Sequence, residues 1–90
     1  MSDVRNNEER SRFELEAEGH TAFAAYAIDG DVITFTHTVV PPALQGMGVG
    51  SKLIAGALGE ARSRGLKVRP DCTFVAAYIA KHPEWQDLRV

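Results

Sequence analysis

Three glycines alternate with other residues in the stretch Gln45-Gly46-Met47-Gly48-Val49-Gly50, where a β-rich part of the chain ends and a helical pattern begins. Each glycine in a helix costs about 1 kcal/mol relative to alanine, so three of them at a helix start need a compensating gain. We infer that this gain is the close approach of an anion, because the free N–H groups and the dipole of a helix N-terminus both favour negative charge. The loop therefore predicts a site for a phosphate or a pyrophosphate.

Two well-known phosphate-binding patterns do not match this loop. A P-loop needs a glycine directly before its lysine and a serine or threonine after it, but Lys52 lies between Ser51 and Leu53. A dinucleotide-binding fingerprint needs a third glycine three places after the second, where this chain has Ser51 or Leu53. A tight turn that only packs a strand against a helix remains an alternative, although it needs fewer glycines.

The only cysteine, Cys72, directly precedes a second predicted helix, and the N-terminus of a helix favours the thiolate form. A thiolate at this place is a candidate nucleophile, and the thiol is a candidate proton donor. A small buried thiol without a chemical role is an equally good interpretation. One cysteine excludes an internal disulfide, and His82 and Glu84 do not have the spacing of a metal site, so we expect no metal ligands.

The hydrophobic pattern predicts the elements that position these residues. Alternation indicates strands over residues 12–17, 21–28 and 31–40, with a hairpin at Asp29-Gly30 between the last two. The period then becomes helical from Leu44 to about Gly65, and a short strand over 66–68 leads to a second helix over 73–81. We expect a wet face on the first strand at Glu14 and Glu16, a second strand that is covered on both sides, and a mostly buried second helix.

This order predicts an α/β (α+β) fold in which an antiparallel meander is followed by a helix, a parallel strand and a C-terminal helix. The first ten residues are polar and without periodicity, so residues 1–10 are predicted to be a flexible arm and 11–90 the domain. A net charge of −2 argues against nucleic acid as a partner, and the chain contains no apolar run long enough for a membrane span. We expect a cytoplasmic protein that is a monomer or a weak dimer.

The loop pattern resembles the coenzyme A pyrophosphate loop of the GNAT acetyltransferase superfamily, in which the loop also joins a central strand to a helix. More narrowly, the chain resembles the minimal single-domain GNAT-like N-acetyltransferases of about this size. Four ordered features carry that resemblance: His37-Thr38-Val39-Val40-Pro41, the Gln45–Gly50 loop, Pro70-Asp71-Cys72 and His82-Pro83-Glu84. Longer members add an N-terminal helical pair and a C-terminal hairpin that grip the acceptor, and this chain has neither pattern.

The resemblance implies a fold, a cofactor and a set of site residues. The cofactor would be acetyl-CoA, and the acetyl acceptor a small amine or a protein lysine. The implied coenzyme-binding residues are Val39, Val40, Gln45, Gly46, Met47, Gly48, Val49, Gly50, Ser51 and Phe74, with Val39 and Val40 receiving the pantetheine arm. The implied catalytic residues are His37 as the base, Cys72 as the nucleophile or acid, and Tyr78 as a proton donor.

Several of these roles have plain structural alternatives. His37 also fits a histidine that is hydrogen-bonded within the sheet, and Phe74 fits an ordinary core residue. Lys52 and Lys67 are candidates for the 3′-phosphate of the coenzyme or are simply solvated. For the whole chain, the alternatives to an enzyme are a module that binds coenzyme A without chemistry, as part of a complex, or a small interaction domain without a ligand.

Overall fold

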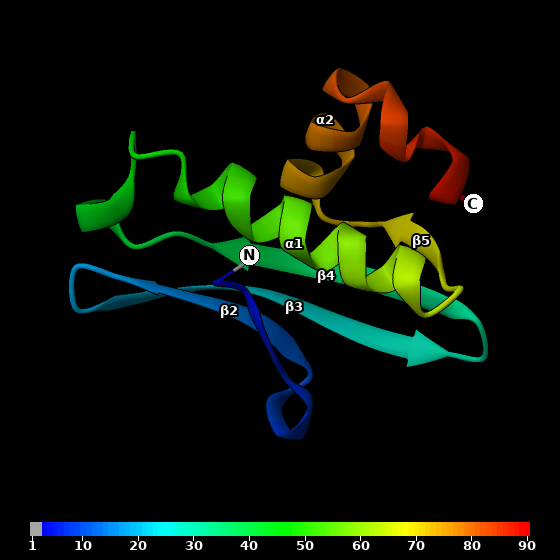
Figure 1. Ribbon diagram of the computed structural model, residues 1–90, viewed down its shortest axis with the longest axis horizontal. Coiled ribbons are helices and arrows are strands. Elements are labelled where there is room, and N and C mark those ends of the chain that lie inside the picture. Colours follow the sequence, from blue (N-terminus) through cyan, green and yellow to red (C-terminus); the bar gives the residue numbers. More distant parts are fainter. Residues whose placement is uncertain (1–2) are drawn as a thin grey trace.

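The computed structural model describes residues 3–90, which form one mixed sheet with its two α-helices above one face (Figure 1). The strands are β1 (Arg5–Asn7), β2 (Arg12–Ala17), β3 (His20–Asp29), β4 (Val32–Val39) and β5 (Lys67–Pro70). The α-helices are α1 (Val49–Ser63) and α2 (Thr73–Lys81), and the 3₁₀ segments are η1 (Glu8–Arg10), η2 (Pro42–Leu44) and η3 (Pro83–Leu88). The mixed α/β fold expected from the sequence is therefore confirmed.

The five strands lie in the order β1-β2-β3-β4-β5, so the chain adds each new strand to the same side of the sheet. Pairings from β1 to β4 are antiparallel, and the β3–β4 hairpin turns at Gly30 with a φ of +62°, a backbone conformation that favours glycine. Helix α1 then crosses back over the sheet, so β5 pairs with β4 in parallel. This crossover places the glycine loop at the end of β4 (Figure 1).

The apolar stripe of α1 forms the centre of the core, as its period predicts. Its buried side chains are Val49, Leu53, Ile54, Ala57, Leu58 and Ala61, and they cover the inward face of the sheet at Phe13, Ala24 and Phe35. Three aromatic rings, Phe13, Tyr26 and Phe35, lie within 5.1–6.5 Å of one another beneath the helix. The helix that carries the loop is thus fixed to the sheet by apolar contacts.

A β-bulge interrupts the pairing of β3 with β4. Ala25 is opposite His37 and Tyr26 is opposite Phe35, so Thr36 is an extra residue on β4. Because side chains alternate between the faces of a strand, this one extra residue reverses which face the side chains at the end of β4 point to, relative to a regular strand. Thr38, opposite the buried Ala24, points to the helix side, whereas His37 points to the other face.

The prediction that residues 1–10 lack structure is wrong for the described part of that stretch, since Arg5–Asn7 add an edge strand to the sheet. The reason is a polar contact that hydrophobic periodicity does not report. Glu14, expected on a wet face, is only 5% exposed, because it accepts hydrogen bonds from Arg5, Asn7 and Arg12 at 2.6–3.2 Å. Residues 1 and 2 of the predicted arm lie outside the described residues.

Two other expectations about burial are also wrong. In β3 only one face is covered, at Ala22, Ala24 and Tyr26, while Ile28 is 41% exposed at the end of the sheet. In α2 only Val75 and Ile79 are buried, while Phe74, Ala77 and Ala80 are exposed and Ala76 and Tyr78 are half-buried, because the helix packs against the sheet along one side only. No helix among residues 3–90 is long and apolar enough to span a membrane.

We predict that Glu14→Gln lowers the free energy of unfolding by about 2 kcal/mol at pH 7. The hydrogen bond from Arg12, with further bonds from Arg5 and Asn7, lowers the pKa of Glu14 from 4.5 to about 2. A lowered native pKa stabilises the fold above the unfolded pKa, and this contribution is lost as the pH falls from about 4.5 toward 2. Urea denaturation at pH 7 and at pH 3 measures the difference. The exposed Glu16 of the same strand is the control, and an equal loss in Glu16→Gln would contradict the prediction.

Candidate functional site

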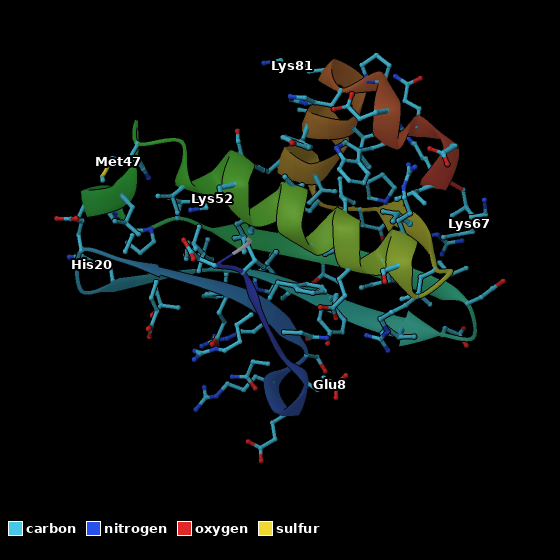
Figure 2. The ribbon with its side chains drawn as sticks, viewed as in Figure 1. Glu8, His20, Met47, Lys52, Lys67 and Lys81 are labelled. Atoms are coloured by element: carbon cyan, nitrogen blue, oxygen red, sulfur yellow. The ribbon has the colours of Figure 1, made fainter. Side chains whose placement is uncertain are left out.

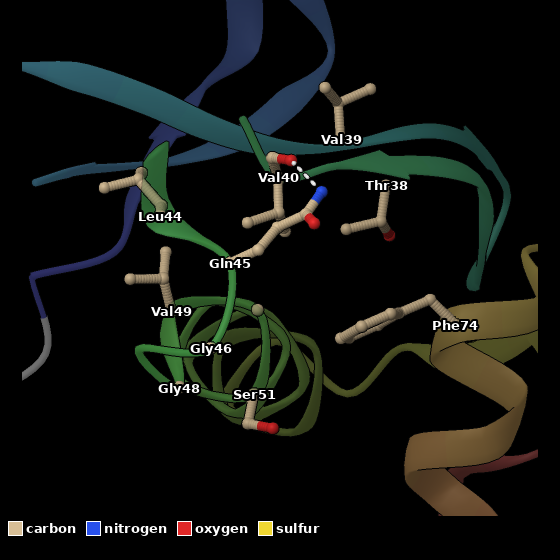
Figure 3. Close-up of a pocket in the computed structure, with 11 residues that line it drawn as sticks. Thr38, Val39, Val40, Leu44, Gln45, Gly46, Gly48, Val49, Ser51 and Phe74 are labelled. Atoms are coloured by element: carbon tan, nitrogen blue, oxygen red, sulfur yellow. Dashed lines mark hydrogen bonds between the residues drawn. The ribbon is translucent and has the colours of Figure 1, made fainter. Parts of the chain in front are cut away.

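A cavity lies where β4 ends, between the glycine loop and the start of α2 (Figure 3). Its volume is about 560 Å³, and it is open to solvent on one side. The lining residues are Thr38, Val39, Val40, Leu44, Gln45, Gly46, Gly48, Val49, Gly50, Ser51 and Phe74. Every residue that the resemblance assigned to coenzyme binding lines this space except Met47, whose side chain is 54% exposed and points away (Figure 2).

The loop turns into α1 through two glycines with a left-handed backbone. Gly46 has a φ of +83° and Gly48 a φ of +74°, conformations that cost other residues about 1–2 kcal/mol. Gly48 is the N-cap residue of α1, and no side chain caps the helix there. The amides of the first turn, at Val49, Gly50 and Ser51, therefore face the cavity mouth without an intrahelical acceptor. This is the arrangement that suits an anion.

Gly50 allows Phe74 to lie directly against the backbone of α1. A Cβ atom at position 50 would be 2.7 Å from Cζ of Phe74, closer than such atoms approach in folded proteins. The ring is 40% exposed and forms the wall of the cavity on the α2 side (Figure 3). The third glycine of the loop is thus explained by packing, whereas the first two are explained by their backbone conformation.

The end of β4 supplies the opposite wall. Pairing of β4 with β5 ends at Phe35 and Pro70, so within the described residues the edge of β4 beyond Phe35 has no partner strand on that side. Nε2 of Gln45 donates a 3.2 Å hydrogen bond to the carbonyl oxygen of Val40 across the mouth (Figure 3). Gln45, which the resemblance implied as a coenzyme-binding residue, therefore holds the loop to the strand end in this structure.

Thr38 connects the cavity with Cys72. The hydroxyl of Thr38 lies 3.3 Å from Sγ of Cys72, whose side chain is only 7% exposed behind it. Cys72 is fixed as the N-cap residue of α2 by its amide, which donates to the carbonyl oxygen of Phe35 at 2.9 Å. The thiol does not line the cavity itself, and Thr38 is the polar side chain that reaches both.

His37 is not brought to the cavity. The bulge directs its side chain to the face of the sheet that the helices leave open, where its ring lies edge-on to Phe23 at 5.9 Å. Arg12 lies above the Phe23 ring at 4.3 Å on the same face. A base at His37 would act from the opposite side of the sheet, so the structure does not support its expected place beside the pantetheine.

The other polar candidates are also placed elsewhere. Tyr78 is half-buried and stacks on His82 at 4.0 Å, in a neighbouring hollow of α2. Lys52 pairs with Asp3 at 2.8 Å, and Lys67 donates to the backbone carbonyl of Asp87 at 3.2 Å, at the opposite end of α1 from Met47 (Figure 2). Within residues 3–90, no group of histidine, cysteine and carboxylate side chains is placed to hold a metal ion.

A family model for the GCN5-related N-acetyltransferases matches residues 12–88, which is most of the chain. The chain belongs to the GCN5-related N-acetyltransferase (GNAT) family. It is also similar to the solution structure of a GCN5-like protein from Staphylococcus aureus, itself a proposed N-acetyltransferase, with 28% sequence identity and a TM-score of 0.75. That match covers 100% of this chain and 91% of the other. Membership of GNAT supports acetyltransferase activity in general and leaves the acceptor open.

Sequence reasoning about this GNAT domain missed two cavity residues, Thr38 and Leu44. Leu44 is fully buried beneath the loop, in the short helix η2, and the apolar residue between Pro42 and the first glycine was a usable signal. Thr38 carried no such signal. In a regular strand, alternation from the buried Phe35 puts His37 on the inward face and Thr38 on the opposite face. Only the bulge at Thr36 exchanges the two.

Proposed function

We propose that this GNAT domain binds acetyl-CoA in the cavity at the end of β4 and transfers its acetyl group to an amine. The observation that carries the proposal is the continuity of the cavity from the bare amides of α1 to Thr38, next to the only thiol of the chain. The pyrophosphate would lie against the amides at Gly48–Ser51. The pantetheine would follow the free edge of β4 at Val39 and Val40 toward Thr38.

The thioester end of the coenzyme then meets the Thr38–Cys72 pair. In the transfer, the amine nitrogen attacks the carbonyl carbon, the carbon–sulfur bond breaks, and the sulfur leaves with the electron pair as a thiolate. Thr38 would pass its hydroxyl proton to this thiolate and take the thiol proton of Cys72, since its oxygen lies 3.3 Å from Sγ. The proton that the amine loses restores the thiol through solvent, so the pair is unchanged after a turnover.

A calorimetric titration with acetyl-CoA tests the binding step. Saturation at 100 times the dissociation constant should also raise the free energy of unfolding by about 2.7 kcal/mol. Release of free coenzyme A with lysine peptides and small amines as acceptors tests the transfer. Absence of both the binding heat and the stabilisation would contradict the proposal.

We predict that His37→Ala changes the affinity for acetyl-CoA by less than about twofold, because the side chain lies on the opposite face of the sheet. Calorimetry on the variant measures this directly. Turnover separates two roles: an unchanged kcat removes His37 from the reaction, while a loss of about a hundredfold would show that His37 acts as a base. Phe23→Leu, which changes the neighbouring ring alone, is the matched control.

A coenzyme A-binding module without turnover is the second candidate function. One observation favours it, since the residues that line the cavity include no histidine or carboxylate that could take a proton from the amine. Binding of acetyl-CoA with no coenzyme release over a broad panel of amines would select this alternative.

A further inference from the structure

The two sulfur atoms in the described part of the chain differ in their access to solvent. Sγ of Cys72 lies behind Thr38, in a residue that is only 7% exposed, whereas Met47 is 54% exposed. Figure 2 shows Met47 on the glycine loop, with its side chain turned outward from the domain. Its neighbours Gly46 and Gly48 have no side chains that would cover it. A dissolved oxidant therefore reaches the thioether of Met47 before the thiol of Cys72.

Packing does not explain a methionine at this place. Met47 belongs neither to the buried core nor to the apolar residues that pack against the core, and it does not line the cavity. Its amide donates to the carbonyl oxygen of Leu44 at 3.3 Å, a backbone contact that any residue other than proline can make. What distinguishes methionine from other exposed apolar residues is its sulfur, because oxidation turns the apolar side chain into a polar one.

Met47 directly precedes the uncapped N-terminus of α1. Gly48 is the N-cap residue and offers no side chain to the helix. The amide of Lys52 donates to the carbonyl oxygen of Gly48 at 3.1 Å, so the amides of residues 49–51 come before this bond and have no intrahelical acceptor. A side chain in the position before the N-cap reaches across the first turn, as it does in the hydrophobic staple. The three rotatable bonds of methionine allow the same reach here.

We propose that Met47 is an oxidation site that controls access to the amides at the start of α1. A lone pair of the sulfur forms a sulfur–oxygen bond as the O–O bond of a hydroperoxide breaks, so the thioether is oxidised by two electrons and hydrogen peroxide is reduced to water. A thioether is only a weak hydrogen-bond acceptor, whereas the sulfoxide oxygen accepts strongly from the amides of residues 49–51. The inference rests on the proposed function for the ligand that the sulfoxide displaces, the pyrophosphate, and it adds the regulation of that site.

Treatment with hydrogen peroxide, followed by peptide mass mapping and calorimetry, tests this inference. The peptide that contains Met47 should gain one oxygen atom while Cys72 remains a thiol. Acetyl-CoA should then bind about fivefold more weakly, because the ligand has to displace one neutral hydrogen bond. Methionine sulfoxide reductase with dithiothreitol should restore the affinity, since the oxygen leaves as water while the dithiol becomes a disulfide.

Two variants separate Met47 from the other sulfur atoms of the chain. Met47→Leu keeps Met1 and Cys72, and it should bind acetyl-CoA like the untreated wild type both before and after peroxide. Met47→Gln places a neutral amide oxygen at a similar reach, so it should have the affinity of the oxidised protein without any treatment. An unchanged affinity in the fully oxidised wild type overturns the inference, as does an equal loss in peroxide-treated Met47→Leu.

Amide hydrogen exchange in the ligand-free protein distinguishes this inference from the proposed function. The amides of residues 49–51 should exchange more slowly after oxidation of the wild type, and peroxide should not change their exchange in Met47→Leu. Equal exchange rates before and after oxidation overturn the inference whether or not acetyl-CoA binds. If oxidation slows the exchange but the untreated protein does not bind acetyl-CoA, the proposed function fails and the oxidation-dependent cap is retained.

Discussion

Replacement of Gly50 by alanine is expected to weaken acetyl-CoA binding by about ten- to hundredfold. The new Cβ atom would be 2.7 Å from Cζ of Phe74, so the ring has to shift away from α1. Since the ring forms the cavity wall opposite the end of β4, its displacement narrows the space for the pantetheine. The amide of residue 50 is kept in the variant, so the loss does not come from a missing hydrogen-bond donor.

A second glycine of the same helix is the control for this variant. A Cβ atom at Gly59 meets nothing within 4 Å, and its backbone is helical, so Gly59→Ala should leave binding unchanged and stabilise the helix by about 1 kcal/mol. In the Phe74→Ala background the effect of Gly50→Ala should largely disappear, because the clash partner is absent. A Gly50→Ala penalty of the same size with and without the Phe74 ring would contradict the account of this wall.

Removal of the Cys72 thiol is expected to lower kcat by about a hundredfold or more while the affinity for acetyl-CoA changes by less than about twofold. The reason is that Cys72 lies behind Thr38 and outside the cavity lining, so its contribution falls on the departing thiolate rather than on the bound coenzyme. Thr38→Val should lower kcat by a similar factor, whereas Thr38→Ser, which keeps the hydroxyl, should retain most of it. Steady-state kinetics together with calorimetry measure both quantities.

An alkylation rate and a mass measurement complete this test. Because the hydroxyl of Thr38 contacts the thiol, Thr38→Val should change the rate of Cys72 alkylation, and Thr36→Val, a neighbouring threonine of β4, should not. Protein mass after incubation with acetyl-CoA checks the route. A stable acetyl group on Cys72 that is passed on to an amine would contradict the role as proton donor and assign a covalent role instead.

The elements with a regular hydrophobic period in the sequence were the predictable ones. The stripe from Val49 to Ala61 gave α1 and its buried face, and the alternation around Phe13 and Leu15 gave β2, because both elements bury one regular face. The hairpin at Gly30 followed from turn chemistry. The positions of the glycine loop and of Cys72 in the chain then followed from the order of these elements.

The features that escaped prediction depend on single contacts between distant residues. The extra residue Thr36 shifts the register of β4 and exchanges His37 with Thr38, and no local pattern reports such a bulge. Glu14 is buried because Arg5 and Arg12 form ion pairs with it from two strands. Its charge therefore led to the wrong prediction that it lies on the exposed face of β2.

The amide chemical shifts of residues 46–51, recorded before and after the addition of coenzyme A, test most directly whether bare amides at the start of α1 bind the pyrophosphate. We expect the amides of Gly48, Val49, Gly50 and Ser51 to show the largest changes, and acetyl-pantetheine, which lacks the pyrophosphate, to perturb Thr38 and Val39 but not these four. Equal changes at Gly48–Ser51 with both compounds, or changes confined to other parts of the domain, would contradict it.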